Sequence, residues 1–148
     1  MFSLKKKKMK KLRVAINGAG RIGRAFIKKA HARDDMEIVA INDLGDKENI
    51  AYLLKYDSAY GVTPIDITTT EKGITFDTKE IAFYSEKDPF NLPWKDLDID
   101  VVVEATGVFR TYDQARMHIT AGAKRVVISA PAKSDPQDES EGTILMGI

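Results

Sequence analysis

The amino-acid sequence predicts an α/β fold, in which helices alternate with the strands of a doubly wound, mostly parallel sheet. Two observations support this prediction: apolar, β-branched runs recur along the chain, and stretches with the spacing of amphipathic helices separate them. Connections between such parallel strands are nearly always right-handed, which gives a doubly wound sheet. The 148 residues are enough for one domain with a substantial core, and 43% hydrophobic with 30% charged residues is an ordinary globular composition.

The first strand is expected at residues 12–17, where apolar and more polar side chains alternate up to a glycine. The pattern then changes to that of a helix, because Ile22, Phe26 and Ala30 recur on one face and basic residues lie on the other. The second strand is expected at residues 37–42, a nearly continuous apolar run that is typical of a parallel strand covered on both faces.

The middle of the chain predicts a second helix and a β-hairpin insertion. The helix is expected around residues 47–55, in which Ile50 and Leu54 share one face. Residues 62–80 hold two runs rich in Thr and Ile on either side of a Glu-Lys-Gly turn, a pattern typical of a hairpin. Residues 81–85 are then expected to rejoin the sheet as its third strand.

The last third of the chain predicts another strand, a capped helix and two further strands. Residues 99–105 form the most apolar run of the sequence and are expected as a buried strand. Thr111 stands three residues before Gln114, which is the spacing of a capping box, and the helix that it opens should close at Gly122. The two further strands are expected at residues 125–129 and 143–148, with a polar surface loop between them.

The charge balance and the absence of cysteine exclude several classes of function. With 23 basic against 22 acidic residues the net charge is +1 at pH 7, so no large field of one sign favours nucleic acid or an anionic membrane. The chain holds no cysteine, which excludes disulfides, thiolate metal sites and a cysteine nucleophile. No metal site is expected, and no apolar run approaches the roughly 18 residues of a membrane span, so we expect a cytoplasmic protein. Residues 1–11 are expected to be a solvated basic tail.

Three glycines, Gly18, Gly20 and Gly23, stand between the first strand and the first helix. Glycines cluster in turns for conformational reasons alone, so their spacing by itself also fits a tight turn without a ligand. Asp43, at the end of the second strand, lies 20 residues beyond Gly23, which is the offset of the ribose-binding acid in a dinucleotide fingerprint. Together the glycines and the acid predict a Rossmann-type site for NAD.

Each glycine of such a site has a physical role. Gly18 permits the sharp turn, Gly20 lets the backbone approach a pyrophosphate, and Gly23 allows the helix to pack closely on the strand. The N-terminus of the helix then supplies free amides, here those of Arg21 and Ile22, and a partial positive charge to the phosphates.

The acid and the remaining strand ends complete the predicted site. Asp43 is expected to accept hydrogen bonds from the adenosine ribose and to repel a 2′-phosphate, which favours NAD over NADP; the alternative is that it caps the next helix. Ligands of such sheets lie beyond the carboxyl ends of the strands, and this rule nominates Lys87, Thr106, Gly107 and Ser129.

The two histidines carry no such signal. His31 falls within the first predicted helix and His118 near the end of another. Because neither has a partner carboxylate or the spacing of a metal ligand, both are expected at the surface or at helix ends, without a catalytic role.

With these residues in hand, the chain resembles the N-terminal half of the glyceraldehyde-3-phosphate dehydrogenases. The matching stretches are INGAGRIGR (16–24), AINDL (40–44), LLKYDSAYG (53–61), VVEATGVF (102–109), AGAKRVVISAPAK (121–133) and TILMGI (143–148). The resemblance implies an NAD-binding domain over residues 12–148, with the basic tail outside it.

The resemblance also implies a place for each site residue. Arg21 and Ile22 would meet the pyrophosphate and Asp43 the adenosine ribose, while Asn17 and Asn42 would border the adenosine site. Thr106, Gly107 and Ser129 would approach the nicotinamide. Lys87 would lie beside the adenine.

In this family the reaction runs on a cysteine and a histidine that follow the stretch matched here, and this chain holds no cysteine. No catalytic residue is therefore expected, and the chain is interpreted as the cofactor-binding part of a longer, truncated enzyme. Two alternatives stay open, one half of a split dehydrogenase and a non-catalytic interaction protein that kept the fold. The resemblance also implies a sheet face that lacks its covering helix, so we expect self-association or a complementary catalytic-domain chain.

Overall fold

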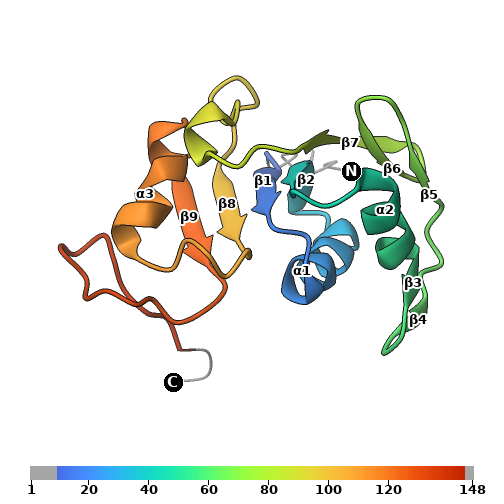
Figure 1. Cartoon of the computed structure of the whole chain (residues 1–148). Helices are drawn as coiled ribbons and strands as arrows, with labels where there is room; N and C mark the ends of the chain where they lie inside the picture. The colour runs from blue at the N-terminus through green and yellow to red at the C-terminus, as the bar shows by residue number, and fades with distance from the viewer. Residues whose placement is uncertain (1–9, 146–148) are drawn as a thin grey trace, which may run out of the picture.

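The computed structural model describes residues 10–145, which form one seven-stranded sheet, a small two-stranded sheet and three α-helices. The predicted tail is described only at Lys10 and Lys11, and residues 1–9 lie outside the described part. Figure 1 shows the elements from the blue N-terminal strand to the red C-terminal loop. They are β1 (Leu12–Asn17), α1 (Arg21–His31), β2 (Met36–Asn42), α2 (Lys47–Lys55), β3 (Tyr56–Asp57), β4 (Gly61–Val62), β5 (Ile67–Thr69), β6 (Gly73–Phe76), β7 (Lys79–Tyr84), the 3-10 turn η1 (Pro89–Asn91), β8 (Val101–Glu104), α3 (Tyr112–Thr120) and β9 (Arg125–Ile128).

The strand order of the large sheet is β5-β6-β7-β2-β1-β8-β9, so the first strand of the chain lies near its centre. On β1, Ile16 pairs in parallel with Ile41 of β2 on one side and with Val103 of β8 on the other. The strands β7 and β9 extend the two sides, also in parallel. The chain thus runs outward from β1 in one direction and returns to its other side, which confirms the predicted doubly wound α/β sheet.

The predicted hairpin is confirmed, and it extends the large sheet. Its strands β5 and β6 pair antiparallel, with Ile67 opposite Phe76, and β6 pairs antiparallel with β7, with Gly73 opposite Ala82. The side chain of Phe76 is fully buried. The two antiparallel strands therefore add both width and core to a sheet that is otherwise parallel.

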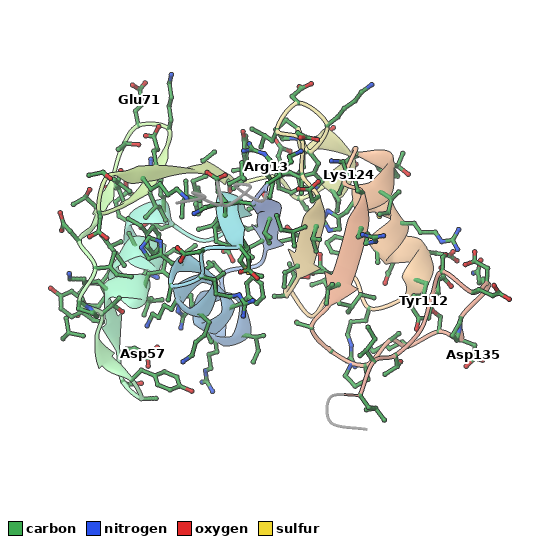
Figure 2. All side chains as sticks on the ribbon, turned by 180° about the vertical axis from the view of Figure 1, so that it is seen from behind. Arg13, Asp57, Glu71, Tyr112, Lys124 and Asp135 are labelled. Atoms are coloured by element: carbon green, nitrogen blue, oxygen red, sulfur yellow. The ribbon has the colours of Figure 1, made fainter. Side chains whose placement is uncertain are left out.

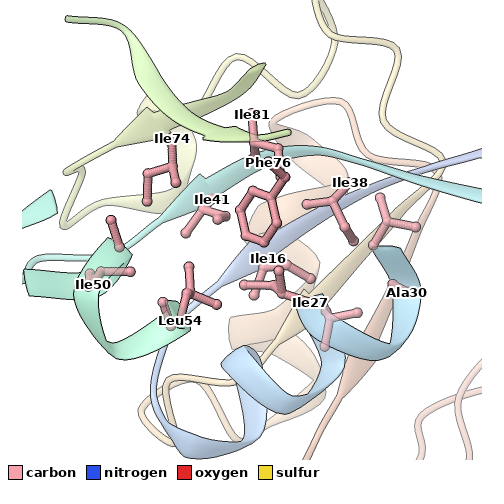
Figure 3. Close-up of a cluster of buried hydrophobic side chains, with 14 residues drawn as sticks. Ile16, Ile27, Ala30, Ile38, Ile41, Ile50, Leu54, Ile74, Phe76 and Ile81 are labelled. Atoms are coloured by element: carbon pink, nitrogen blue, oxygen red, sulfur yellow. The ribbon is translucent and has the colours of Figure 1, made fainter. Parts of the chain in front are cut away.

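Two hydrophobic clusters, one on each face, hold the sheet in place. The larger cluster, drawn in Figure 3, packs Ile27 of α1 and Leu54 of α2 against Ile16, Ile41 and other strand residues. Leu54 and Ile27 are both fully buried, and burial of one such side chain stabilises the fold by roughly 1.5–3 kcal/mol. The opposite face is covered by the segment around η1 and by α3, with Trp94 at the centre of the second cluster.

Two of the three helices begin with a capping side chain, and α1 does not. Asp46 caps α2 and accepts a hydrogen bond from the amide of Asn49 at 2.8 Å. Thr111 and Gln114 form the predicted capping box at the start of α3. The N-cap of α1 is Gly20, and no side chain of residues 10–145 caps this helix. The alternative role for Asp43, as the cap of the next helix, is therefore wrong, because Asp46 takes that position.

Ion pairs gather at the amino ends of the strands. Lys124, which precedes β9, binds the carboxylates of Asp98 at 2.9 Å and Asp100 at 2.6 Å, and Figure 2 shows it at the same end of the molecule as Arg13. The hydrogen bonds from Lys124 and Lys10 lower the pKa of Asp98 to about 2. This charged end lies opposite the carboxyl ends of the strands, where the predicted site residues are found.

The strand predicted at residues 143–148 is wrong for the part that the structure describes. Residues 143–145 have no strand conformation, and Ile144 is 86% exposed. Apolar runs become strands only when a neighbouring strand pairs with them, and within residues 10–145 none lies beside this run. Residues 146–148 lie outside the described residues. Across the described range, no helix is long and apolar enough to cross a membrane.

Candidate functional site

The predicted site residues lie at one edge of the sheet. The five parallel strands β7, β2, β1, β8 and β9 all point the same way, so their carboxyl ends share this edge. Every predicted residue is at, or directly after, one of these ends: Asn17, Gly18, Gly20, Arg21, Ile22 and Gly23 after β1; Asn42 and Asp43 at β2; Lys87 after β7; Thr106 and Gly107 after β8; and Ser129 after β9. We call this place the carboxyl edge.

The loop from Gly18 to Gly23 is shaped by close backbone approaches. Gly18 has a φ of +98°, and a Cβ added there would lie 2.7 Å from the amide nitrogen of Thr106. A Cβ on Gly23 would lie 2.0 Å from the carbonyl oxygen of Gly18, so the first turn of α1 packs directly on the end of β1. These two positions accept only glycine, the first for its backbone conformation and both for space.

Gly20 differs from the other two glycines. A Cβ added there would meet no atom of residues 10–145 within 4 Å. Gly20 precedes the first turn of α1, where the amides of Arg21 and Ile22 come before the first intrahelical acceptor. The first turn contains no acidic residue, so the partial positive charge of the helix end is not offset there. The loop thus presents free space beside amides that suit an anion.

The side chain of Asp43 is hydrogen-bonded to this glycine loop. Its Oδ2 accepts a hydrogen bond from the amide of Ala19 at 2.7 Å, and its Oδ1 accepts one from the amide of Gly45 at 2.7 Å. Each carboxylate oxygen has a second lone-pair direction, because an ionised carboxylate offers about four acceptor sites. The acid that follows β2 is therefore held beside the glycine loop with acceptor capacity left for a ligand.

Asn17 and Asn42 are buried beneath the edge and join β1 to β2. The side-chain amide of Asn42 donates to Oδ1 of Asn17 at 2.7 Å and to the carbonyl oxygen of Glu86 at 2.9 Å. The exposed fractions of the two side chains are only 2% and 4%. Their side chains thus fix the strand ends to one another and lie under the surface of the site.

The remaining predicted residues border the same edge from both sides. Thr106 follows β8 and its amide donates to Oε1 of Glu104 at 2.9 Å, while Gly107 has a φ of +74°. The amide of Ser129 donates to the carbonyl oxygen of Glu104 at 2.9 Å, which places the start of the β9 loop beside the end of β8. Lys87 is exposed beyond β7, on the far side of β2 from the glycine loop.

His118 corrects one expectation from the sequence. It lies near the end of α3, as the expectation of a surface or helix-end position allowed, but its side chain is fully buried and it has the partner carboxylate that it was expected to lack. Its Nε2 lies 2.9 Å from Oε2 of Glu104, a buried carboxylate that the sequence analysis did not select. The sequence signal for a buried Glu104 was an acid within the apolar run 99–105. The signal for a buried His118 was its position three residues after Ala115, which places both on one face of α3.

The carboxylate of Asp57 links the helix α1 to the β3–β4 hairpin. Asp57 of β3 accepts hydrogen bonds from the amides of Ala59 and Tyr60, and its Oδ2 lies 3.2 Å from Nζ of Lys28 on α1. These amides, followed by Lys28, lower the pKa of Asp57 to about 2. The β3–β4 hairpin is thereby tied to the helix that begins at the glycine loop.

Among the described residues no cluster of His, Asp and Glu is arranged to hold a metal ion.

The doubly wound sheet, the glycine loop and the acid after β2 define a dinucleotide-binding domain of the Rossmann class. Comparison with known proteins gives the family: the chain belongs to the glyceraldehyde-3-phosphate dehydrogenases, because residues 12–112 match the model "Glyceraldehyde 3-phosphate dehydrogenase, NAD binding domain". This confirms the resemblance seen in the sequence and NAD as the cofactor of the domain.

Individual relatives agree with the family. A glyceraldehyde-3-phosphate dehydrogenase of Thermotoga maritima is 51% identical over 125 residues, which are 83% of this chain and 38% of the relative. One of Mycoplasma pneumoniae is 49% identical over 126 residues, 85% of this chain and 37% of the relative. A cytosolic one of Trypanosoma brucei brucei is 49% identical over 124 residues, 84% and 38% of the two chains. The chain therefore spans less than half the length of these relatives.

Proposed function

We propose that the carboxyl edge holds NAD for an oxidoreductase that converts glyceraldehyde 3-phosphate to an acyl phosphate in glycolysis. The observation that carries this proposal is the free space beside Gly20 at the start of α1, where the amide of Ala19 in the same loop donates a hydrogen bond to Asp43. When bound, NAD supplies the acceptor for the hydride. The residues of this chain bind and orient it, and residues 12–148 make up the binding domain while residues 1–11 stay outside it.

The glycine loop binds the pyrophosphate. The amides of Arg21 and Ile22 donate to the phosphate oxygens, and Gly20 leaves the space for their approach. Gly18 and Gly23 support this geometry by their close packing and do not themselves touch the phosphates. The positive end of α1 adds an attraction that no acid in its first turn offsets.

Asp43 selects the cofactor. Its free acceptor directions take the two hydroxyls of the adenosine ribose, and its charge repels the extra phosphate of NADP. Asn17 and Asn42 hold the strand ends below the adenosine side, since their side chains are buried against one another. Beyond them the edge continues to the adenine on one side, at Lys87, and to the nicotinamide on the other, at Thr106, Gly107 and Ser129.

The chain binds NAD without carrying out the chemistry alone. The thiol that the family uses is not among these residues, because the sequence contains no cysteine. The exposed side chain of Val127 on β9 supports an association that would complete the enzyme. Val127 and Val103 are register partners in a parallel pair and so share one face, yet Val127 is 54% exposed and Val103 only 6%. A second copy or a complementary catalytic-domain chain covers Val127 in this proposal, and the assembly works in the cytoplasm, as the cytosolic relative from Trypanosoma brucei brucei does.

The test is a calorimetric titration of the chain with NAD and with NADP, repeated for Asp43→Asn. The wild-type chain is expected to prefer NAD by about tenfold or more, and the variant to lose most of that preference, because like-charge repulsion is removed. Asn keeps one oxygen that can accept from the amide of Ala19 or of Gly45 and loses the other acceptor, so the thermal stability of the variant is measured beside the titration. Asp46→Asn is the matched control, since Asn still caps α2 and should leave the preference unchanged. Absence of heat with NAD would contradict the proposal.

Oligomeric state and activity give two further checks. Sedimentation of the chain alone should show association that weakens in Val127→Lys, and a dispersed monomer at high concentration would contradict the proposed partner surface. The chain alone should not oxidise glyceraldehyde 3-phosphate, and measurable turnover would show that the proposed need for an external thiol is wrong.

A further inference from the structure

A chain of buried polar side chains runs beneath the carboxyl edge. Of the five buried polar or charged residues that the described structure holds, four belong to it, namely Asn17, Asn42, Glu104 and His118. Burial of polar groups costs free energy unless every one of them is hydrogen-bonded, and such networks rigidify the parts that they join. This one joins the ends of β1, β2 and β8, from which the loops of the cofactor site emerge.

The direction of the hydrogen bonds at His118 is set by Trp94. The indole Nε1–H of Trp94 lies 3.0 Å from Nδ1 of His118, and an indole can only donate. Nδ1 is therefore the acceptor and carries no proton, which leaves the proton of the neutral ring on Nε2. Nε2 lies 2.9 Å from Oε2 of Glu104, so His118 donates to this carboxylate. Nε2 and the side-chain amide of Asn17, 3.3 Å apart, are then both donors to the same oxygen and not partners of one another.

Glu104 accepts from four donors. Oε2 accepts from His118 and from Nδ2 of Asn17 at 2.6 Å, and Oε1 accepts from the amide and the hydroxyl of Thr106. An ionised carboxylate has about four acceptor sites, so these four donors fill all of them. The hydroxyl of Thr106 in turn accepts from the amide of Val108 at 3.1 Å, which extends the network into the loop after β8.

We propose that His118 is a positioning residue for the cofactor site, which acts through Glu104 and touches no cofactor itself. Held as the Nε2–H tautomer between Trp94 and Glu104, it orients the carboxylate that anchors Asn17 under the glycine loop and Thr106 on the nicotinamide side. This role rests on the proposed NAD site. In it, the buried His118 of α3 sets the spacing between the glycine loop and the Thr106 loop.

Two contacts outside the hydrogen bonds support this role. The backbone of Thr106 lies directly behind Gly18, because a Cβ on Gly18 would come within 2.7 Å of its nitrogen, so a shift of one loop moves the other. Phe109, at the far end of the Thr106 loop, packs edge-on against the His118 ring with their centroids 6.3 Å apart. His118 thus contacts Glu104 and Phe109, the residues on either side of the Thr106 loop.

The test compares His118→Asn with His118→Gln. The amide nitrogen of Gln reaches the place of Nε2 and can still donate to Glu104, whereas Asn reaches only the place of Nδ1 and can still accept from Trp94. Each variant keeps one of the two hydrogen bonds, so a merely structural role would change both alike. Loss of a charge-assisted hydrogen bond to Glu104 is expected to weaken NAD binding by about tenfold in His118→Asn, with a change within about twofold in His118→Gln.

Leu92→Ala is the control, because the side chain of Leu92 is buried in the Trp94 cluster and, being aliphatic, makes no hydrogen bond there. It should lower the thermal stability and leave the NAD dissociation constant of the folded chain unchanged. Equal losses of affinity in the Asn and Gln variants, or a folded Asn variant that binds like the wild type, would overturn the positioning role. A wild-type chain that does not bind NAD would overturn the proposed function and the cofactor role of His118 with it.

A measurement on the wild-type chain keeps the test open if the Asn variant does not fold. The nitrogen chemical shifts of the His118 ring should show a bare Nδ1 and a protonated Nε2, and a proton on Nδ1 would overturn the proposal. Trp94 is the single tryptophan of the sequence, so its indole N–H gives one signal, which should shift when NAD is added.

Discussion

The helices α1 and α3 begin in opposite ways, although each follows a parallel strand and packs against the same sheet. At α3, Thr111 and Gln114 satisfy the first amides with their own side chains, and Asp113 adds a negative charge to the first turn. At α1, the N-cap is Gly20, and no capping side chain or first-turn acid is found within residues 10–145. The chain therefore satisfies the start of α3 with its own side chains and leaves the start of α1 without a side-chain cap.

The difference agrees with the proposed binding of the pyrophosphate at the start of α1. With glycine at the N-cap, the loss relative to a capping side chain is only a few tenths of a kcal/mol, and a bound anion can restore it. The second helix, α2, follows the pattern of α3, since Asp46 caps it and Glu48 lies in its first turn. Among the three described helices, only the one with the glycine loop departs from this pattern.

The largest effect is expected when the close packing of α1 is broken. In Gly23→Ala the new methyl group would lie 2.0 Å from the carbonyl oxygen of Gly18, so helix and strand must separate. We expect a loss of about 3 kcal/mol in the free energy of unfolding, measured by chemical denaturation, together with loss of NAD binding. Gly20→Ala is the control for stability alone, because its Cβ meets no atom of the described residues, although it would fill the space proposed for the pyrophosphate. Unfolding like the wild type in Gly23→Ala would contradict the packing argument.

A smaller effect is expected when α1 is given the cap that it lacks. Gly20→Asp should raise the stability by about 0.5 kcal/mol, because the acid accepts from the first amides and interacts with the helix dipole. The same acid should weaken NAD binding by at least about tenfold, since it occupies and repels the pyrophosphate site. Gly20→Asn separates the two causes, because it caps without a charge. Unchanged affinity for NAD in the Asp variant would show that the phosphates lie elsewhere.

The reverse change at α3 should affect stability alone. Thr111→Ala removes the side chain that accepts from the amide of Gln114 and should cost about 1 kcal/mol in the free energy of unfolding. NAD affinity of the folded chain should stay within about twofold of the wild type, because α3 begins away from the glycine loop. Thr111→Ser keeps the hydroxyl and should restore the stability. A large loss of NAD affinity in the Ala variant would contradict the contrast between the two helix starts.

The smallest effect is expected from the first-turn charge of α3. Asp113→Asn removes the charge and keeps an acceptor for Nε2 of Gln137, which lies 3.1 Å away. The expected loss is about 0.3–0.5 kcal/mol at low ionic strength, and it should shrink as salt is added, because screening weakens the interaction with the helix dipole. Denaturation curves at two salt concentrations measure it. A loss that is the same at both would point to the hydrogen bond and not to the charge.

The elements with strong local signals were predicted closely. The strand at residues 12–17 and the helix at residues 47–55 have the expected bounds, and the capping box at Thr111 is present. In each case the decisive features, alternation, helical spacing or a capping pair, lie within a few residues of one another. The position of Asp43 beside the glycine loop could also be predicted, because parallel strands end at a common edge.

The wrong predictions concern features that depend on distant partners. Residues 143–145 have the composition of a strand, but a strand needs a neighbour to pair with. His118 was expected to lack a partner carboxylate, but Glu104 and Trp94, both distant in the sequence, lie beside its buried ring. The hairpin was predicted correctly, but its place at the end of the large sheet follows from its pairing with β7.

The central place of β1 also has a consequence for the order in which the fold is made. The amide of Arg13 on β1 donates to Asp100, at the start of β8, and these two residues are 87 positions apart in the chain. At the usual pace of synthesis, roughly 5–20 residues per second, β1 waits several seconds on the ribosome before β8 emerges. During this time β2 can cover only one of its two edges. The strand that carries the glycine loop is thus made well before β8 and is enclosed on its second edge only after β8 has emerged.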